Sequence, residues 1–239
     1  MDYGRLTAAY AAMEQTRSRL EIASLLAELF HDTPPEELAA VAHLCLGQLG
    51  PAYDSREIGL SDKSVLRTLA LASGVALAEL QVTYAEAGDI GLVAEEALAI
   101  KAQQPLFEAP LTVSRVWKRL HTLSRETGTG SQERKFRALA ELLHDGTPQD
   151  ARYLCRTAVG KLRLGFSQML LVDGLAEAFG SREERGMVEA AYNRRPDIGW
   201  LAQRAAADFG SLDAVRVEPG IPLRPMLGER LSSAEAVLE

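Results

Sequence analysis

The sequence predicts an all-α fold, and three observations support that prediction. Apolar residues recur at spacings of three and four along nearly the whole chain, as in roughly twelve amphipathic helices. Strand-like alternation is scarce, and 214–217 is the only weak candidate. Helix starts are well marked: Ser18 opens a Ser-x-x-Glu capping box, and Thr33-Pro34 and Thr147-Pro148 each place a cap before a proline.

The chain also contains an internal repeat, with copies at 16–98 and 129–206 joined by 110–125. Leu26–Pro34 matches Leu139–Pro148 with one added glycine, and Asp89–Ala94 matches Asp197–Ala202. Because the matches keep their order, we expect two helical subdomains related by an approximate two-fold, forming one domain over 1–215. In this alignment Ser18 and Ser131 cap equivalent helices, Cys45 corresponds to Cys155, Gly50 corresponds to Gly160, and the helix before the glycine is about one turn longer in the first copy.

A short glycine-bounded turn stands out in the second copy. The helix opened by Thr147 is predicted to end at Gly160, and Ser167 can cap the next helix. Between Gly160 and Gly165 the turn carries Lys161 and Arg163, so exposed N–H groups and positive charge can meet a phosphate there. The alternative is that both glycines only punctuate helices. The corresponding first-copy segment, 51–58, is longer and net acidic.

The charge distribution is uneven. The net charge of −7 divides into −9 for 1–110, +6 for 111–165 and −4 for 166–239. A basic middle segment between acidic ones can mark a nucleic-acid surface, and it can equally be a solvated face. A two-fold that presents the same helix starts twice suits a ligand with quasi-symmetric backbones, such as duplex DNA.

Several classes of protein are excluded by missing patterns. The four histidines lack ligand spacing with the two cysteines, and no phosphate-binding loop, nucleophile elbow or catalytic dyad is recognisable. No run of eighteen apolar residues occurs, and the first residues do not resemble a signal peptide. Cys45 and Cys155 fall in apolar helical patterns, which indicates buried thiols and a reducing compartment. We therefore expect a cytoplasmic protein, nucleoid-associated if prokaryotic, without a membrane partner.

Three motifs carry a family resemblance: Ala158–Gly165, then Ala191-Tyr192-Asn193 with Asp197-Ile198-Gly199, then Pro219–Leu227. Together they resemble the N-terminal DNA-binding domain of ATP-dependent DNA ligases of the archaeal and eukaryotic replicative type. The resemblance covers essentially the whole chain. It implies an all-helical domain that holds nicked duplex DNA across the minor groove, through backbone and basic contacts, for replication, repair and recombination. Residues 216–239, proline-rich and extended, are expected to begin the linker into an adenylation domain.

The resemblance also implies particular DNA contacts. Carried over residue by residue, the family pattern predicts nucleic-acid contacts at Thr16, Arg17, Ser18, Arg19, Gly130, Ser131, Gln132, Lys135, Gly160, Lys161, Arg163 and Gly165. Phosphate contacts of this kind position a protein on a duplex without reading its bases.

One departure from the family concerns catalysis. The family seals nicks through a lysine in a Lys-x-Asp-Gly motif, and none of the five lysines here stands in that pattern. We expect no catalytic residue, metal or cofactor in this chain, with ATP and Mg²⁺ serving the parent enzyme. The expected partner is nicked double-stranded DNA, bound by a monomer, with a sliding clamp as a further candidate. The rival hypotheses are a helical protein–protein interaction scaffold and a sequence-specific helix-turn-helix regulator.

Overall fold

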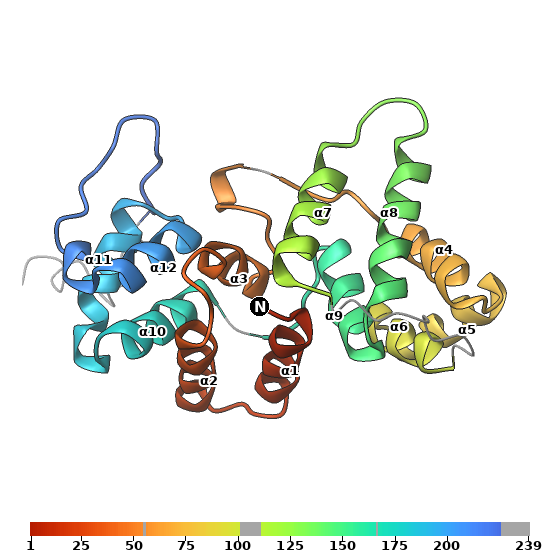
Figure 1. Cartoon of the computed structure of the whole chain (residues 1–239), viewed down its shortest axis with the longest axis horizontal. Coiled ribbons are helices and arrows are strands. Elements are labelled where there is room, and N and C mark those ends of the chain that lie inside the picture. Colours follow the sequence, from red (N-terminus) through yellow and green to blue (C-terminus); the bar gives the residue numbers. More distant parts are fainter. Residues whose placement is uncertain (55, 101–110, 166, 226–239) are drawn as a thin grey trace, which may run out of the picture.

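The computed structural model describes residues 1–54, 56–100, 111–165 and 167–225, and in them the chain is all-helical (Figure 1). This confirms the predicted fold class. The described residues form twelve α-helices, three short 3₁₀ helices and no strand, so 214–217 is not a strand. The α-helices are α1 (Tyr3–Glu14), α2 (Arg19–His31), α3 (Leu38–Cys45), α4 (Asp62–Ser73), α5 (Leu77–Ala87), α6 (Ile90–Ala99), α7 (Val113–Arg125), α8 (Ser131–Asp145), α9 (Pro148–Ala158), α10 (Gln168–Phe179), α11 (Arg185–Arg194) and α12 (Ile198–Ala207).

Helices of the two sequence copies pack across one another. The most extensive contacts join α2 to α10 and α6 to α9, followed by α3 to α12 and α4 to α8. In Figure 1, α2 and α3 accordingly lie with α10–α12, and α4–α6 lie with α8 and α9. Each spatial half of the molecule therefore contains helices from both copies. These reciprocal pairs are what a two-fold relation between the copies would produce.

In two of these helix pairs, a glycine allows the helices to approach closely. A Cβ added at Gly174 of α10 would lie 2.7 Å from the Leu26 Cβ of α2. One added at Gly91 of α6 would lie 2.7 Å from the backbone oxygen of Arg152 in α9. Only glycine allows these helix axes to approach so closely, because any other residue would displace the neighbouring helix.

The structure corrects the alignment of the repeat. At the end of α9, the N–H groups of Gly160 and Lys161 donate to Thr157 O (3.0 Å) and Arg156 O (2.8 Å). At the end of α3, Gly47 and Gln48 donate in the same pattern, at 2.9 and 3.0 Å. Gly47 and Gly160 both have positive φ, +65° and +69°. The counterpart of Gly160 is thus Gly47 and not Gly50. Because the same shift applies to the preceding helix, Cys45 and Cys155 are not counterparts either.

This shift arises because α3 is shorter than α9, not longer as predicted. Thr147 caps α9 in a full capping box with Asp150, and Pro148 is its first residue, as predicted. Thr33 instead donates its hydroxyl to Leu29 O at 2.6 Å, and α3 begins only at Leu38. With Gly47 as the counterpart of Gly160, the extra residues of the first copy lie after the helix, in 48–58, and not within it.

The core is continuous and dominated by aliphatic side chains. Cys45 and Cys155 are buried free thiols, as predicted, and burial raises the pKa of Cys45 to about 12. Helix α7 buries Val113, Val116 and Leu120 against the rest of the core. Among the described helices, none combines the length and apolarity that crossing a bilayer requires.

The last described segment folds back onto α11. The Arg224 N–H donates to Asn193 O at 3.0 Å, and the Arg224 guanidinium lies over the Tyr192 ring, 5.7 Å from its centroid. Two of the motifs that carried the family resemblance thus meet in space. Residues 226–239, including the end of the third motif, lie outside the described residues.

Candidate nucleic-acid interface

The turn after α9 alternates buried and exposed side chains. Leu162 and Leu164 are 6% and 9% exposed and anchor the turn in the core. Lys161, Arg163 and Gly165 lie between and beside them and are exposed. With both leucines buried, Lys161 and Arg163 lie on the solvent side of the turn. Gly160 adopts the left-handed conformation that the sequence predicted for a helix end.

Both cations of the turn have oxygen partners from the first copy. Lys161 Nζ lies 3.1 Å from Asp62 Oδ2 at the start of α4. Arg163 donates to Gly88 O at 3.0 Å, and its guanidinium lies 3.6 Å from Asp89 Oδ2. Their side chains remain 53% and 48% exposed, so both are accessible to a ligand. Arg163 has a φ of +60°, an uncommon conformation for a residue other than glycine.

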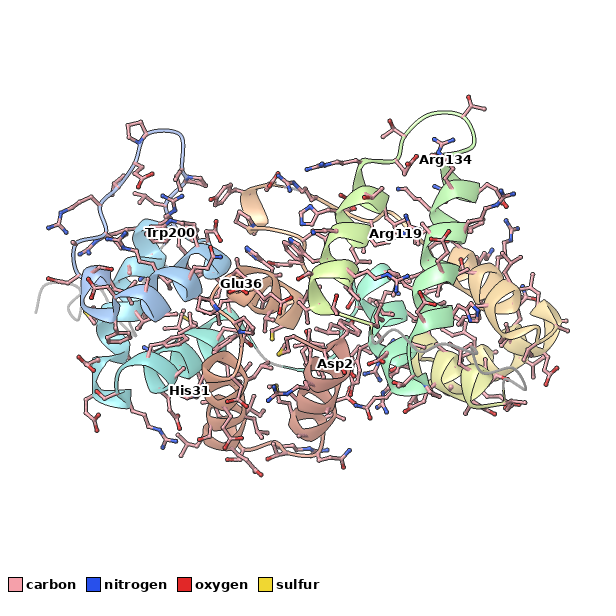
Figure 2. The ribbon with its side chains drawn as sticks, viewed as in Figure 1. Asp2, His31, Glu36, Arg119, Arg134 and Trp200 are labelled. Atoms are coloured by element: carbon pink, nitrogen blue, oxygen red, sulfur yellow. The ribbon has the colours of Figure 1, made fainter. Side chains whose placement is uncertain are left out.

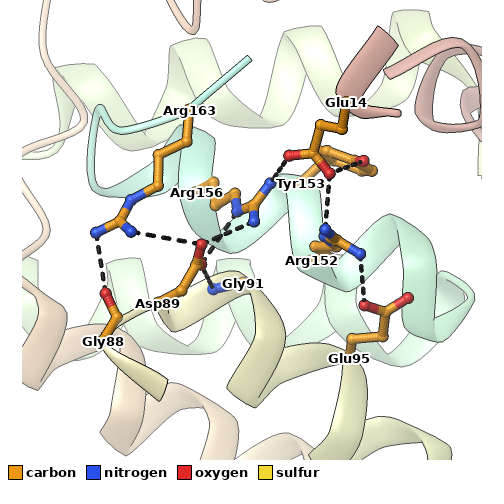
Figure 3. A network of polar contacts seen from close by, with 9 residues as sticks. All are labelled: Glu14, Gly88, Asp89, Gly91, Glu95, Arg152, Tyr153, Arg156 and Arg163. Carbon is orange, nitrogen blue, oxygen red and sulfur yellow. Dashed lines mark hydrogen bonds and ion pairs between the residues drawn. The ribbon is translucent and has the colours of Figure 1, made fainter. Parts of the chain in front are cut away.

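An ionic network centred on the buried Arg156 and Asp89 lies beside the turn (Figure 3). Arg156 is 4% exposed and donates to Asp89 Oδ1 and Oδ2 at 3.1 and 2.7 Å and to Glu14. Arg152 lies beside it and donates to Glu14 at 2.7 Å and to Glu95 at 3.0 Å. Arg156 thus joins the end of α1 to the start of α6, directly before the turn.

Asp89 is the central carboxylate of this network. It caps α6 by accepting from Gly91 N at 2.8 Å. Burial alone would raise the pKa of Asp89, but the hydrogen bonds and charge of Arg156 outweigh burial and lower it. The sequence alone did not reveal this role of Arg156. The sequence signal for the role of Asp89 was the Asp-x-Gly pattern, which is repeated at Asp197. Asp197 similarly caps α12 and contacts His43 of α3 at 3.2 Å.

The start of α8 forms a second glycine turn. Gly128 and Gly130 have φ of +79° and +76°. Gly130 is the N-cap, with no side chain capping the helix, so the prediction that Ser131 is the cap is wrong: Ser131 is the first helical residue. Arg134 closes the preceding loop by donating to Thr127 O and Thr129 O, both at 3.2 Å. Ser131 and Gln132 are accessible, and an uncapped helix start can receive an anion.

Lys135 does not reach solvent as a DNA contact would. Its side chain is buried, 7% exposed, and Nζ donates to Ile58 O at 2.7 Å. The geometry therefore favours a structural role, in which Lys135 ties the segment before α4 to α8. Lys135 lies on the inner face of α8, at helical spacing from the buried Leu139 and Leu142.

The first-copy set, 16–19, lies at the loop between α1 and α2. Ser18 caps α2 by accepting from Glu21 N at 3.3 Å, while the Thr16 hydroxyl donates to the Glu21 carboxylate at 2.6 Å. Arg19 pairs with Asp173 at 3.2 Å, and Arg17 is exposed without an ion-pair partner among the described residues. Figure 1 shows this loop at the lower edge and the loop between α7 and α8 at the upper edge. The two predicted helix starts therefore lie on opposite edges in this view.

The basic character of the middle segment is partly neutralised. On α7, Arg115 pairs with Asp145 and Arg119 pairs with Glu141 of α8. Figure 2 labels Arg119 between α7 and α8. Lys118 and Arg125 are exposed and have no ion-pair partner among the described residues. Within the described part of the chain, no cluster of three His, Cys, Asp or Glu side chains is suited to a metal.

The chain belongs to the family described as DNA ligase N terminus, which matches residues 2–207. It is 41% identical over 250 residues to DNA ligase 2 of Thermofilum pendens, and 41% identical over 242 residues to a DNA ligase of Pyrobaculum arsenaticum. It is also 42% identical over 233 residues to DNA ligase 2 of Korarchaeum cryptofilum. These alignments cover 96–100% of this chain but only 39–41% of each relative. The chain thus spans about two-fifths of the length of these relatives.

Proposed function

We propose that this chain is a DNA-binding domain of an ATP-dependent DNA ligase and that it holds nicked duplex DNA by its phosphate backbones. The observation that carries the proposal is the turn from Gly160 to Gly165, where Lys161 and Arg163 are exposed beside two buried leucines and between left-handed glycines. Gly160 and Gly165 have no side chain, so their backbone can approach a phosphate closely, and the two cations supply charge-assisted hydrogen bonds to it.

The proposed contact surface is narrower than the sequence predicted. It consists of Gly160, Lys161, Arg163 and Gly165, together with the start of α8 at Gly130, Ser131 and Gln132. Thr16, Arg17, Ser18 and Arg19 form a further proposed contact, in which Arg17 supplies the accessible cation. Lys135 supports the surface from inside.

The remaining functions are proposed for the parent protein. We infer that adenylyl transfer, with ATP and Mg²⁺, belongs to residues other than these 239, because they contain no Lys-x-Asp-Gly sequence. The domain would act as a monomer within that enzyme during replication, repair and recombination. A sliding clamp is a further proposed partner.

Fluorescence anisotropy with labelled duplexes tests the proposal. A nicked duplex, an intact duplex of the same sequence and a nicked duplex of unrelated sequence are titrated at about 50 mM and about 200 mM salt. We expect binding that weakens with salt and is similar for the two nicked sequences, because phosphate contacts carry no base information. A strong preference for one sequence would favour a regulator. No binding at either salt concentration would contradict the proposal and favour a protein–protein scaffold.

A further inference from the structure

The two cations of the turn already have oxygen partners in the unbound protein. Lys161 faces the carboxylate of Asp62, and Arg163 faces Gly88 O and Asp89. All three partners belong to the first copy of the repeat and lie in the part of the molecule that contains α4–α6. A phosphate that approaches this turn therefore meets cations that already have oxygen partners.

The two carboxylates, Asp89 and Asp62, differ in how strongly their surroundings fix them in place. Asp89 is 6% exposed, and Gly91 N–H and Arg156 already use its oxygens, so it cannot move without disturbing α6 and α9. The Asp62 side chain is 28% exposed and lies in the first turn of α4, after the cap Ser61. The Asp62 side chain is thus less enclosed than that of Asp89, which is 8% exposed.

Tyr84 of α5 is a neighbour of Asp62. The pKa of Tyr84 is raised, first by burial and then by the charge and hydrogen bond of Asp62. A negative charge that disfavours a second negative charge at Tyr84 disfavours a phosphate beside Lys161 for the same reason. Carboxylate and phosphate oxygens also make the same kind of charge-assisted bond to an ammonium group.

We propose that Asp62 is a built-in competitor for phosphate at Lys161, which lowers the affinity of this surface for DNA. The proposal rests on the proposed function and identifies a residue that tunes it. When DNA binds, Lys161 exchanges the Asp62 carboxylate for a phosphate oxygen or shares its three N–H donors between them. The acidic partner makes the contact weaker and more readily reversible than the two cations alone would make it.

The variant Asp62→Asn tests the proposal by anisotropy with the labelled nicked duplex. The side chain keeps its shape while the charge is lost, so Lys161 becomes available to phosphate. An exposed ion pair is worth up to about 1 kcal/mol, which corresponds to about fivefold in affinity. We expect Asp62→Asn to bind about two- to fivefold more tightly than the unaltered chain at about 50 mM salt, with a smaller gain at about 200 mM.

Asp32→Asn is the matched control. It removes one negative charge from another exposed pair, Arg5–Asp32 at 2.8 Å, and so reports the effect of net charge alone. A second background, Lys161→Met, isolates the pair: there Asp62→Asn should change affinity no more than Asp32→Asn does. Thermal unfolding of each variant checks that it is folded.

The outcomes separate the two proposals. If the unaltered chain binds and Asp62→Asn does not exceed the Asp32→Asn control, the competitor proposal is wrong and the proposed function stands. If Asp62→Asn weakens binding, Asp62 orients Lys161 for DNA and the competitor proposal is again overturned. If the unaltered chain does not bind, both proposals are overturned.

Discussion

Removing both cations of the turn should flatten the salt dependence of DNA binding. The change is Lys161→Ala with Arg163→Ala, which removes two phosphate contacts from the proposed surface. Each phosphate contact contributes about −0.9 to the slope of log affinity against log salt, so the slope should become shallower by about 1.8. Between about 50 and about 200 mM salt, the variant should lose about twelvefold less affinity than the unaltered chain.

The fold should tolerate this change. Both side chains are about half exposed, and pairs such as Lys161–Asp62 contribute little to stability. Arg163 has a φ of +60°, so alanine there keeps a left-handed strain of about 1–2 kcal/mol. Arg163→Gly removes the same cation without that strain. It should match Arg163→Ala in DNA affinity and exceed it in thermal stability.

The assay is a salt series of anisotropy titrations with the nicked duplex. The control is Arg5→Ala with Arg216→Ala, which lowers the net charge by the same amount at two exposed arginines outside the proposed surface. If the turn variant kept the slope of the unaltered chain, or if the control flattened it equally, the turn would be only helix punctuation.

Three further predictions concern the supporting residues. Lys135→Met should lower the free energy of unfolding by about 1–3 kcal/mol, because it leaves a buried carbonyl unpaired, and should keep the salt slope; a shallower slope would restore Lys135 as a contact. Gly91→Ala should cost about 1–3 kcal/mol in urea unfolding, since its Cβ would lie 2.7 Å from both Arg152 O and Arg156 Nε; an unchanged midpoint would refute the close approach. Because the folded pKa of Asp89 is depressed, its stabilisation is present above the unfolded pKa of about 3.9 and is lost as pH falls through the folded value. Urea titrations from neutral to acidic pH should therefore show a smaller loss of stability in Asp89→Asn than in the unaltered chain.

The helical fold was readable from the sequence because it depends on local chemistry. Periodicity identified the helices, and Thr147, Ser18 and Gly160 marked ends that the structure has in the same places. The same reasoning failed at Thr33, where the hydroxyl bonds backwards to Leu29 O and the next helix begins later. It failed there because Glu37 accepts hydrogen bonds from the N-terminal ammonium of Met1 and from Ser114, groups that lie far away in the sequence.

The candidate site was only partly predictable. The glycines and cations of the turn were visible as a local pattern, so Lys161 and Arg163 were identified. Their partners were not, because Asp62 and Asp89 belong to the other copy and reach the turn only when the helices of the two copies pack across one another. The bond that buries the Lys135 ammonium group was missed for the same reason, since its partner Ile58 O lies 77 residues away.

The sequence by itself determined which segments are helical, where a basic turn interrupts them and which family the motifs resemble. Spacing, capping and glycine conformation depend on residues a few positions apart, so a local stretch of sequence is enough to predict them. Only the tertiary structure decided which carboxylates face those cations and which predicted contact is buried. Ion pairing and burial depend on residues that folding brings together from distant parts of the chain. A local sequence pattern therefore does not predict them.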